Sequence, residues 1–268
     1  MPLPILSAHH ASAEDLMRFF HKTELHWGRH VAEETQLDVG TALSNPELKT
    51  VWDANRMLDA ALPDGVDPAH AVEEAEAHFA KVGATCWSWT LARSAPAERI
   101  GPLAEHLISR GFLEDGFDVM YLDHPRGMEE AAGLTIIPAR ASFKHYRMLA
   151  EEWAGQYNTP DFVEAVMMHL DDPHVDALVA LKDQKPAGFV AVLSVGEIGG
   201  IQEMFVSGAF RNQGIGRTMM SRALEICARS LFRHVFVGVD PQNAAAVQIY
   251  SKAGFKRLGR YVQYRRPK

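Results

Sequence analysis

The stretch Arg211-Asn212-Gln213-Gly214-Ile215-Gly216-Arg217-Thr218 follows an apolar segment that ends at Val206, and it begins a run with helical periodicity. The first amides of a helix have no partner within the helix and lie at the positive end of its dipole. The two glycines of the stretch lack a Cβ, so the backbone can approach an anion closely. Its two arginines can add charge-assisted contacts. The stretch therefore predicts a turn that binds a phosphate or pyrophosphate group. The alternative is an ordinary glycine-rich helix start.

Two better-known phosphate motifs do not describe this turn. The Walker loop requires Gly-x-x-x-x-Gly-Lys-Ser/Thr, and no lysine follows the glycines here. The dinucleotide fingerprint requires a third glycine early in a βαβ unit, whereas Met219 stands at that position and the turn comes late in the chain. The turn therefore indicates a phosphate ligand outside these two classes.

The elements around the turn alternate between strand and helix. After residue 133 the hydrophobic pattern predicts strands at 134–137, 177–181, 187–195, 201–206, 234–239 and 255–265, and helices at 142–153, 161–170, 214–229 and 243–253. A turn at Lys185-Pro186 is expected between two of these strands. Before residue 133 the hydrophobic pattern predicts helices at 13–34, 68–81 and 97–110, and strands at 85–91 and 117–122. The pattern is typical of an α/β protein with a mixed (α+β) sheet.

A short internal repeat links the two halves. Five positions recur at an offset of 143, namely Gly111-Phe112, Gly116, Val119 and Tyr121, which return as Gly254-Phe255, Gly259, Val262 and Tyr264. Each set follows a predicted helix, so we expect both halves to end in the same helix–glycine–strand unit; coincidence is the alternative. Proline and glycine punctuate residues 124–128, which predicts one module at 1–128 and a second at 133–268.

Composition and charge limit the class of protein. The chain has 268 residues and a net charge of −7, with 47% hydrophobic and 23% charged residues, which are globular proportions. Residues 1–132 carry a net charge of −12, and residues 133–268 a net charge of +5. The acidic total disfavours nucleic-acid binding. The chain has two cysteines and no long apolar run or signal peptide, so we expect a cytoplasmic protein without disulfides or a membrane span.

A metal site is not predicted. His26 and His30 lie one helical turn apart, with Glu33 and Glu34 nearby, a spacing that can bind zinc. However, Trp27 stands where a metalloprotease helix has its glutamate. With 13 histidines in the chain, such a pair also arises readily by chance.

The residues downstream of the phosphate turn extend the pattern. Arg211-x-x-Gly214-x-Gly216 resembles the Gln/Arg-x-x-Gly-x-Gly/Ala signature of the GNAT superfamily of acyl-CoA-dependent N-acyltransferases. The segment Asn243-x-x-Ala246-x-x-x-Tyr250-x-x-x-Gly254-Phe255 is similar to the second block of that family. The resemblance implies a complete GNAT fold from about residue 133. The first half then resembles a partial, degenerate GNAT module in a tandem arrangement.

The resemblance also implies where acetyl-CoA would bind. Backbone groups near Met204 and Val206 would pair with the pantetheine arm, which would enter a gap between the strand ending at Val206 and the strand starting at His234. Pyrophosphate contacts would come from Arg211, Asn212, Gln213, Gly214, Ile215, Gly216, Arg217 and Thr218, with the amides of residues 213–218 as donors. Asn243 would lie near the coenzyme, and helix N-capping is an equally good role for it.

Two residues are candidates for the chemistry. Tyr250 could protonate the departing CoA thiolate as a general acid; its alternative role is packing on the core face of a helix. Glu203 is the leading general base for the incoming amine, although a solvent-facing strand position or a water chain in place of any single base is also consistent with the sequence. Cys227 falls within a helix, where a buried packing thiol is expected rather than a nucleophile.

The sequence thus predicts an N-acetyltransferase that moves an acetyl group from acetyl-CoA to a primary amine by direct attack in a ternary complex. The acceptor would be a small molecule or peptide, and the acidic first half favours a cationic one. A non-catalytic acyl-CoA sensor or scaffold, or an interaction protein whose halves dock, are the alternatives. In the first half Leu107 is the counterpart of Tyr250 and no glycine-rich turn is present, so that half is expected neither to bind CoA nor to catalyse. A homodimer is left open.

Overall fold

The computed structural model describes residues 11–156, 159 and 161–267. The chain divides into two compact units, and each is formed by two separate segments. Unit 1 contains residues 117–260 together with the start of the chain up to His26. Unit 2 contains residues 27–116 and 261–268. The division differs from the expected boundary at 128–133, because the strands that follow the two repeated helices each pass from one unit into the other.

Unit 1 contains a mixed sheet. Its strands, in the order in which they pair, are β5 (Leu113–Leu122, from Phe117 on), β10 (His234–Val239), β9 (Ile198–Val206), β8 (Lys185–Val195), β7 (Val175–Lys182) and β6 (Leu134–Pro138). β9 and β10 run parallel, and the other neighbours run antiparallel. The mixed α/β fold expected from the sequence is confirmed.

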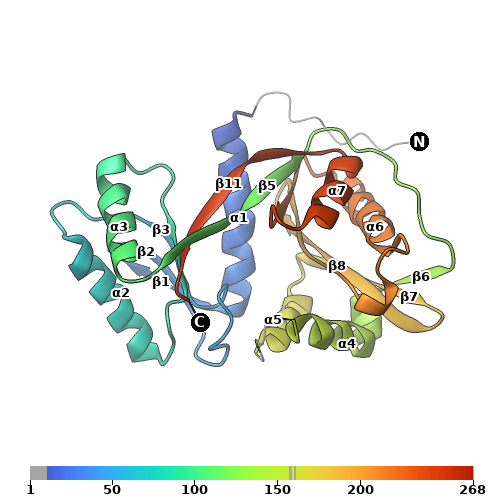
Figure 1. Ribbon diagram of the computed structural model, residues 1–268, viewed down its shortest axis with the longest axis horizontal. Coiled ribbons are helices and arrows are strands. Elements are labelled where there is room, and N and C mark those ends of the chain that lie inside the picture. Colours follow the sequence, from blue (N-terminus) through green and yellow to red (C-terminus); the bar gives the residue numbers. More distant parts are fainter. Residues whose placement is uncertain (1–10, 157–158, 160, 268) are drawn as a thin grey trace. The chain divides into compact units, whose positions relative to one another are not determined.

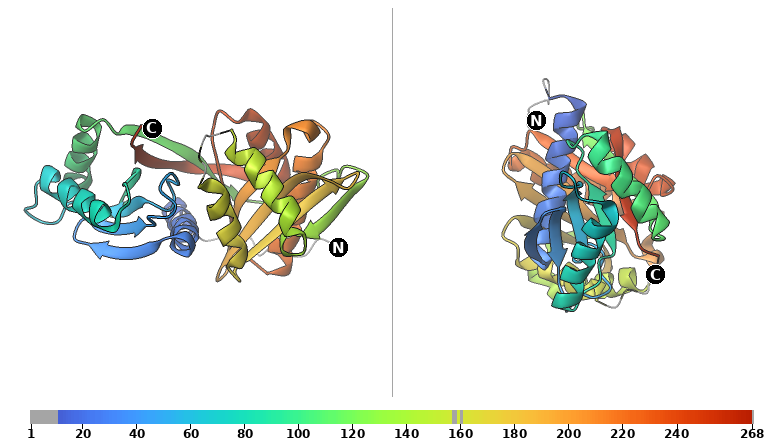
Figure 2. Two further views of the ribbon diagram at one scale, coloured as in Figure 1. Left: turned by 90° about the horizontal axis from the view of Figure 1, so that it is seen from below. Right: turned by 90° about the vertical axis from the view of Figure 1, so that its left-hand side faces the viewer.

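Helices cover both faces of this sheet. Helices α6 (Ile215–Arg229) and α7 (Ala244–Ala253) lie on one face, and α4 (Phe143–Ala154) and α5 (Phe162–Met168) lie on the other (Figures 1 and 2). Under α6 and α7 the core contains the side chains of Met219, Val237 and Tyr250. Under α4, an aromatic cluster joins Trp153 to Phe189 and Phe205, with ring centroids 5.7 and 5.9 Å apart.

The first helix of the described chain belongs to both units. Helix α1 (Ala13–Val31) has its residues up to His26 in unit 1, where Phe20 contacts Phe117 and Phe236 edge to face. The sequence predicted a helix to about Glu34. It ends earlier because Glu33–Leu37 form strand β1.

Unit 2 contains a smaller sheet. Its strands pair in the order β1 (Glu33–Leu37), β2 (Gly40–Ser44), β3 (Arg56–Ala60), β4 (Ser88–Leu91) and β11 (Phe255–Arg265, from Tyr261 on), with helices α2 (Pro68–Val82) and α3 (Ala97–Ser109). The side chains of Phe79, Trp89 and Leu107 lie in its core.

The two units repeat one order of elements. In unit 2 the order is β3–α2–β4–α3, and then β5; in unit 1 it is β9–α6–β10–α7, and then β11. Each first pair of strands is parallel. The closing strands are exchanged: β5 follows α3 but pairs with β10, and β11 follows α7 but pairs with β4. This is a tandem arrangement in which each unit borrows the last strand of the other.

Two local expectations are wrong. The turn between β7 and β8 lies at Asp183 and Gln184, which both adopt positive φ (49° and 63°), and not at Lys185-Pro186. Pro186 instead belongs to β8, beside a register irregularity where a missing amide donor is tolerated. Strands β1, β2 and β3 were not predicted, because their short sequences show no clear alternation of polar and apolar residues.

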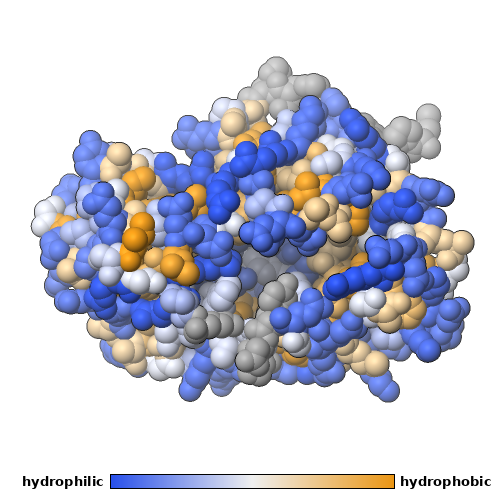
Figure 3. Space-filling view, viewed as in Figure 1, coloured by the Kyte–Doolittle hydropathy of each residue, from blue (hydrophilic) through white to orange (hydrophobic). Residues whose placement is uncertain are grey.

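Polar side chains cover most of the face shown in Figure 3, with hydrophobic residues scattered among them. Within the described ranges, no helix is both long enough and apolar enough to cross a bilayer.

Candidate active site

The parallel strands β9 and β10 separate part of the way along. Their register runs from the pair Ile198 and His234 to the pair Ile201 and Val237, and β9 then continues to Val206 without pairing to β10. The separation begins at a bulge, because Val192 of β8 is opposite Ile201 whereas Ala191 is opposite Glu203. A bulge bends and twists its strand, which accounts for the divergence at this point.

The separated part of β9 presents backbone groups to the gap. The amide of Ser207 donates to the carbonyl of Ala187 on β8 (3.0 Å). Antiparallel pairing alternates along a strand, so residues 203, 205 and 207 bond to β8, and the backbone groups of Met204 and Val206 point to the other side. The Val206 carbonyl accepts a long contact from Arg211 Nε (3.5 Å). This edge can therefore bind an extended ligand by strand-like hydrogen bonds.

The turn before α6 leaves helix amides unused. Gly214 is the N-cap residue with φ 81°, and no side chain caps the helix. In the described part of the chain, the amides of residues 214–217 have no hydrogen-bond acceptor. The amide of Thr218 donates to the Gly214 carbonyl (3.1 Å), and its hydroxyl accepts from the Ala131 amide (2.8 Å). Of the donors expected at residues 213–218, the Thr218 amide is therefore already engaged within the protein.

The side chains of the turn add positive charge. Arg211 is exposed and Arg217 is half-buried, and neither has a carboxylate partner within the described residues. The side-chain amide oxygen of Gln213 accepts from Lys182, which brings a third cation to the turn. Asn212 adopts a positive φ of 61° and is exposed. Unpaired cations beside free helix amides favour an anionic ligand.

The two glycines of the turn serve different purposes. Gly214 adopts a left-handed backbone that strains most other residues. Gly216 is buried, and a Cβ there would lie 3.0 Å from Ile249 of α7. The second glycine thus allows close packing of α6 and α7.

Tyr250 lies on α7 and is only 6% exposed. Its ring packs in the core between α6 and the sheet, 6.1 Å from the ring of Phe255. Burial raises the pKa of the Tyr250 phenol to about 12. The hydroxyl therefore stays protonated at neutral pH, as a general acid must.

Glu203 lies on the opposite face of β9 and is buried, so the solvent-facing alternative is wrong. Its carboxylate accepts a hydrogen bond from the Tyr146 hydroxyl of α4 (3.1 Å), and its other oxygen lies 3.7 Å from Nδ1 of His169. Burial and the neighbouring carboxylate raise the pKa of Tyr146 well above its usual value. Tyr146 and His169 could not be found from the sequence, because neither belongs to a motif.

Two further residues have structural roles. The side chain of Asn243 accepts from the Ala246 amide (3.1 Å) and caps α7. Cys227 is fully buried, and burial raises the pKa of its thiol to about 12. That pKa agrees with the expected packing role.

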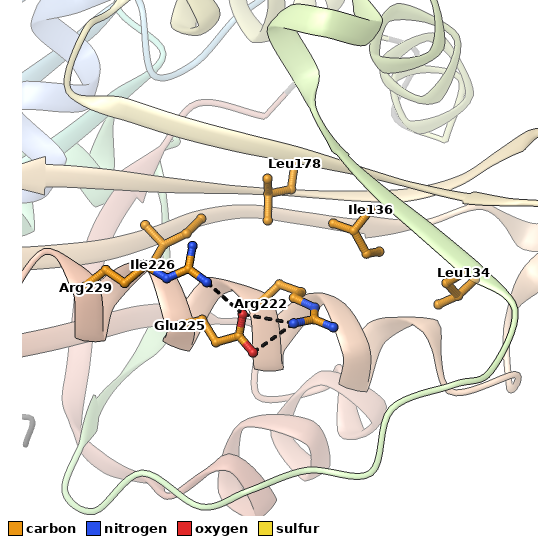
Figure 4. A pocket seen from close by; sticks show the side chains of 7 residues that line it. All are labelled: Leu134, Ile136, Leu178, Arg222, Glu225, Ile226 and Arg229. Carbon is orange, nitrogen blue, oxygen red and sulfur yellow. Dashed lines mark hydrogen bonds and ion pairs between the residues drawn. The ribbon is translucent and has the colours of Figure 1, made fainter. Parts of the chain in front are cut away.

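A pocket lies elsewhere on unit 1, between α6 and strands β6 and β7 (Figure 4). It has a volume of about 370 Å³ and is lined by Leu134, Ile136, Leu178, Arg222, Glu225, Ile226 and Arg229. Arg222 and Arg229 both pair with Glu225. The pocket does not include the phosphate turn, Tyr250 or Glu203, so it is separate from the candidate active site.

Comparison with known proteins assigns this architecture. The model of the acetyltransferase (GNAT) family matches residues 143–255, which include β9, the turn, α6, β10 and α7. Residues 143–255 are a GNAT domain. An uncharacterised N-acetyltransferase from Methanocaldococcus jannaschii is 33% identical over 79 residues, which are 27% of this chain and 35% of that protein. The match thus spans about a third of the length of this relative.

Solved structures extend the likeness beyond the GNAT domain. A GCN5-related N-acetyltransferase from Kribbella flavida has a TM-score of 0.65 and 18% identity, and the alignment covers 93% of this chain and 95% of that one. A tandem GNAT protein from the clavulanic acid biosynthesis pathway has a TM-score of 0.50 and 17% identity, over 73% of this chain and 67% of its own. The fold of the whole chain is therefore that of a GNAT domain preceded by a degenerate GNAT-like module.

Proposed function

We propose that this protein transfers an acetyl group from acetyl-CoA to a primary amine of a small molecule or peptide. The observation that carries the proposal is that, within the described residues, the turn at residues 214–217 offers helix amides without an acceptor and β9 offers an unpaired backbone edge at Met204 and Val206. Acetyl-CoA carries a diphosphate and an extended arm with two amides, which these two sets of backbone groups match in kind and in order. When bound, it supplies an activated thioester.

Each group of the chain then has a defined task. The amides of residues 214–217, with Arg211 and Arg217, hold the diphosphate, and the β9 edge orients the arm. Glu203 accepts a proton from the attacking amine through water, because its carboxylate is buried and does not lie at the surface. The amine attacks the carbonyl carbon directly. As the C–S bond breaks, the hydroxyl of Tyr250 donates its proton to the departing sulfur.

The test is release of CoA thiol from acetyl-CoA across a panel of amines. We expect turnover with at least one primary amine by the wild-type protein, and a large loss of turnover in Tyr250→Phe with binding of acetyl-CoA retained. Calorimetric binding without turnover across the panel would favour an acyl-CoA sensor instead. Absence of CoA binding at millimolar concentration would overturn both.

A further inference from the structure

Three side chains that the proposed reaction does not use lie together in unit 1. Nε2 of His26 is 2.9 Å from Oδ2 of Asp172, and Nδ1 of His174 is 2.9 Å from Oδ1 of the same carboxylate. One ligand atom from each residue lies within 4.8 Å of the others. The two imidazole rings meet edge to face, with centroids 5.0 Å apart. His26 comes from α1, and the other two come from the loop before β7, where Asp172 is 146 positions away along the chain.

The loop that carries Asp172 and His174 is firmly fixed. The carboxylate of Asp172 is only 3% exposed and accepts the His174 amide (2.8 Å). The Arg140 guanidinium donates to the carbonyls of Leu170, Asp172 and Val175. Arg140 thus satisfies backbone oxygens, and the carboxylate oxygens face the two histidines. The loop that carries Asp172 and His174 is therefore held by contacts that do not depend on an ion.

The chemistry of this set matches a transition-metal ion. Two imidazole nitrogens and one carboxylate are ligands that suit zinc and its neighbours, which bind nitrogen and oxygen at about 2.0–2.2 Å. Ligand atoms round one such ion lie roughly 3–3.5 Å apart, so a small rotation of the histidines closes the set. The side chains of His174 and His26 are 56% and 31% exposed, so both rings have room to rotate and the set is accessible from solvent.

We propose that His26, Asp172 and His174 bind one divalent transition-metal ion, with zinc as the fitting example. The ion would join α1 to the loop before β7. This site was not predicted from the sequence. The helical spacing there points from His26 to His30, whereas the partners of His26 in the structure lie far away in the chain. The site is independent of acetyl transfer, so its test does not depend on the proposed function.

The test uses the full-length protein after treatment with a chelator and removal of the chelator. Zinc is titrated by calorimetry, and cobalt(II) is titrated with the visible absorption spectrum as the readout. We expect one zinc per chain at micromolar affinity, a cobalt spectrum of four- or five-coordinate type, and a higher melting temperature with zinc. Acidification should weaken binding, because protons compete for the imidazole nitrogens.

Variants separate this site from other histidines. His174→Ala and Asp172→Asn should each lower zinc affinity at least tenfold and abolish the cobalt spectrum. The matched control is His124→Ala, which removes an exposed histidine whose ring lies 3.8 Å from Asp123 with no third ligand in the described residues; it should bind zinc as the wild type does. Absence of zinc binding by the wild type, or binding that both site variants retain, would overturn the proposal. Circular dichroism checks that the variants are folded. If they are not, the wild-type cobalt spectrum is the test: a four- or five-coordinate spectrum supports the site, and its absence contradicts it.

Discussion

Helices α2 and α6 occupy the same place in the two units and have the same length of 15 residues, yet their first turns differ. Asp67 caps α2, and its carboxylate accepts the Ala69 amide (2.9 Å), while Pro68 has no amide hydrogen at all. Gly214 begins α6 without a side-chain cap. A carboxylate at a helix N-terminus repels the anion that an open N-terminus attracts. The same helix is therefore closed to phosphate in one unit and open in the other.

The strands beside these helices differ in the same sense. β9 and β10 stop pairing after Ile201 and Val237. β3 and β4 continue to pair, across a register shift, as far as Ala60 and Leu91, and the Ala92 amide donates to the Ala60 carbonyl (2.9 Å). The position of Tyr250 is taken in the first half by Leu107, which is fully buried. Unit 1 thus has an open gap, uncapped helix amides and a tyrosine on its last helix, whereas unit 2 has paired strands, a capped helix and a leucine at the corresponding places.

The largest effect that tests this contrast is expected at Tyr250. In Tyr250→Phe, kcat should fall about 10²–10⁴-fold, because a general acid is lost while the ring still packs. KM for acetyl-CoA should change little. The control is Tyr264→Phe, which removes the hydroxyl of a tyrosine on β11. This variant should retain the wild-type kcat. Equal activity of Tyr250→Phe and wild type would remove the catalytic distinction between the halves.

The pH profile checks the same residue in the wild type. Burial raises the pKa of Tyr250 to about 12, so the acid remains protonated as pH increases. We therefore expect no fall in kcat with an apparent pKa near 10, the value of an ordinary phenol. Measurement of kcat between pH 7 and 10.5 tests this, and a clear decline centred on pH 10 in buffers where the protein stays folded would contradict it.

The repeated glycines should differ in stability. Gly254 has φ 106°, and a Cβ there would lie 1.8 Å from the carbonyl oxygen of His124. Gly111 has φ 86° with open space around it. Gly254→Ala should lower the free energy of unfolding by about 2–4 kcal/mol, and Gly111→Ala by about 1 kcal/mol. Urea denaturation of both variants measures the difference; equal losses would mean that the two helix ends are equally crowded.

The capping carboxylate of α2 can be introduced at the start of α6 by substitution. Gly214→Asp gives α6 the carboxylate that α2 has, so acetyl-CoA should bind about 10- to 100-fold more weakly. Gly214→Asn has the same shape without the charge and also tolerates a positive φ, so its affinity should fall less. Calorimetry of both variants gives the affinities, and one CoA per wild-type chain is expected. Two CoA molecules bound per chain, or equal losses of affinity in the two variants, would contradict the expected difference between α2 and α6.

The smallest effect concerns the thiols, one in each unit. Cys86 and Cys227 are both buried, and burial raises the pKa of each to about 12. Neither should react with a thiol reagent at pH 8 while the protein is folded, and both should react in denaturant. Rapid labelling of either thiol in the native protein would show that its unit opens locally.

The sequence was a good guide where one short segment contains the whole signal. The turn at residues 211–218 and the block from Asn243 to Phe255 predicted the GNAT fold because their donors and glycines are contiguous. The pairing of Tyr146 with Glu203, and of His26 with Asp172, joins positions 57 and 146 apart, and only the folded chain brings them together. The turn at Asp183 and Gln184 was missed because glutamine rarely adopts a positive φ.

The exchange of β5 and β11 has a consequence for how the chain is made. The strand that completes the sheet of unit 2 is among the last parts of the described chain to leave the ribosome, although Trp27–Gly116 emerge much earlier. Domains usually fold as units, from the N-terminus onward, during synthesis. Here the early module keeps an unpaired edge at β4 until the residues of β11 have been synthesised, so its sheet is completed long after its own first strands have been made.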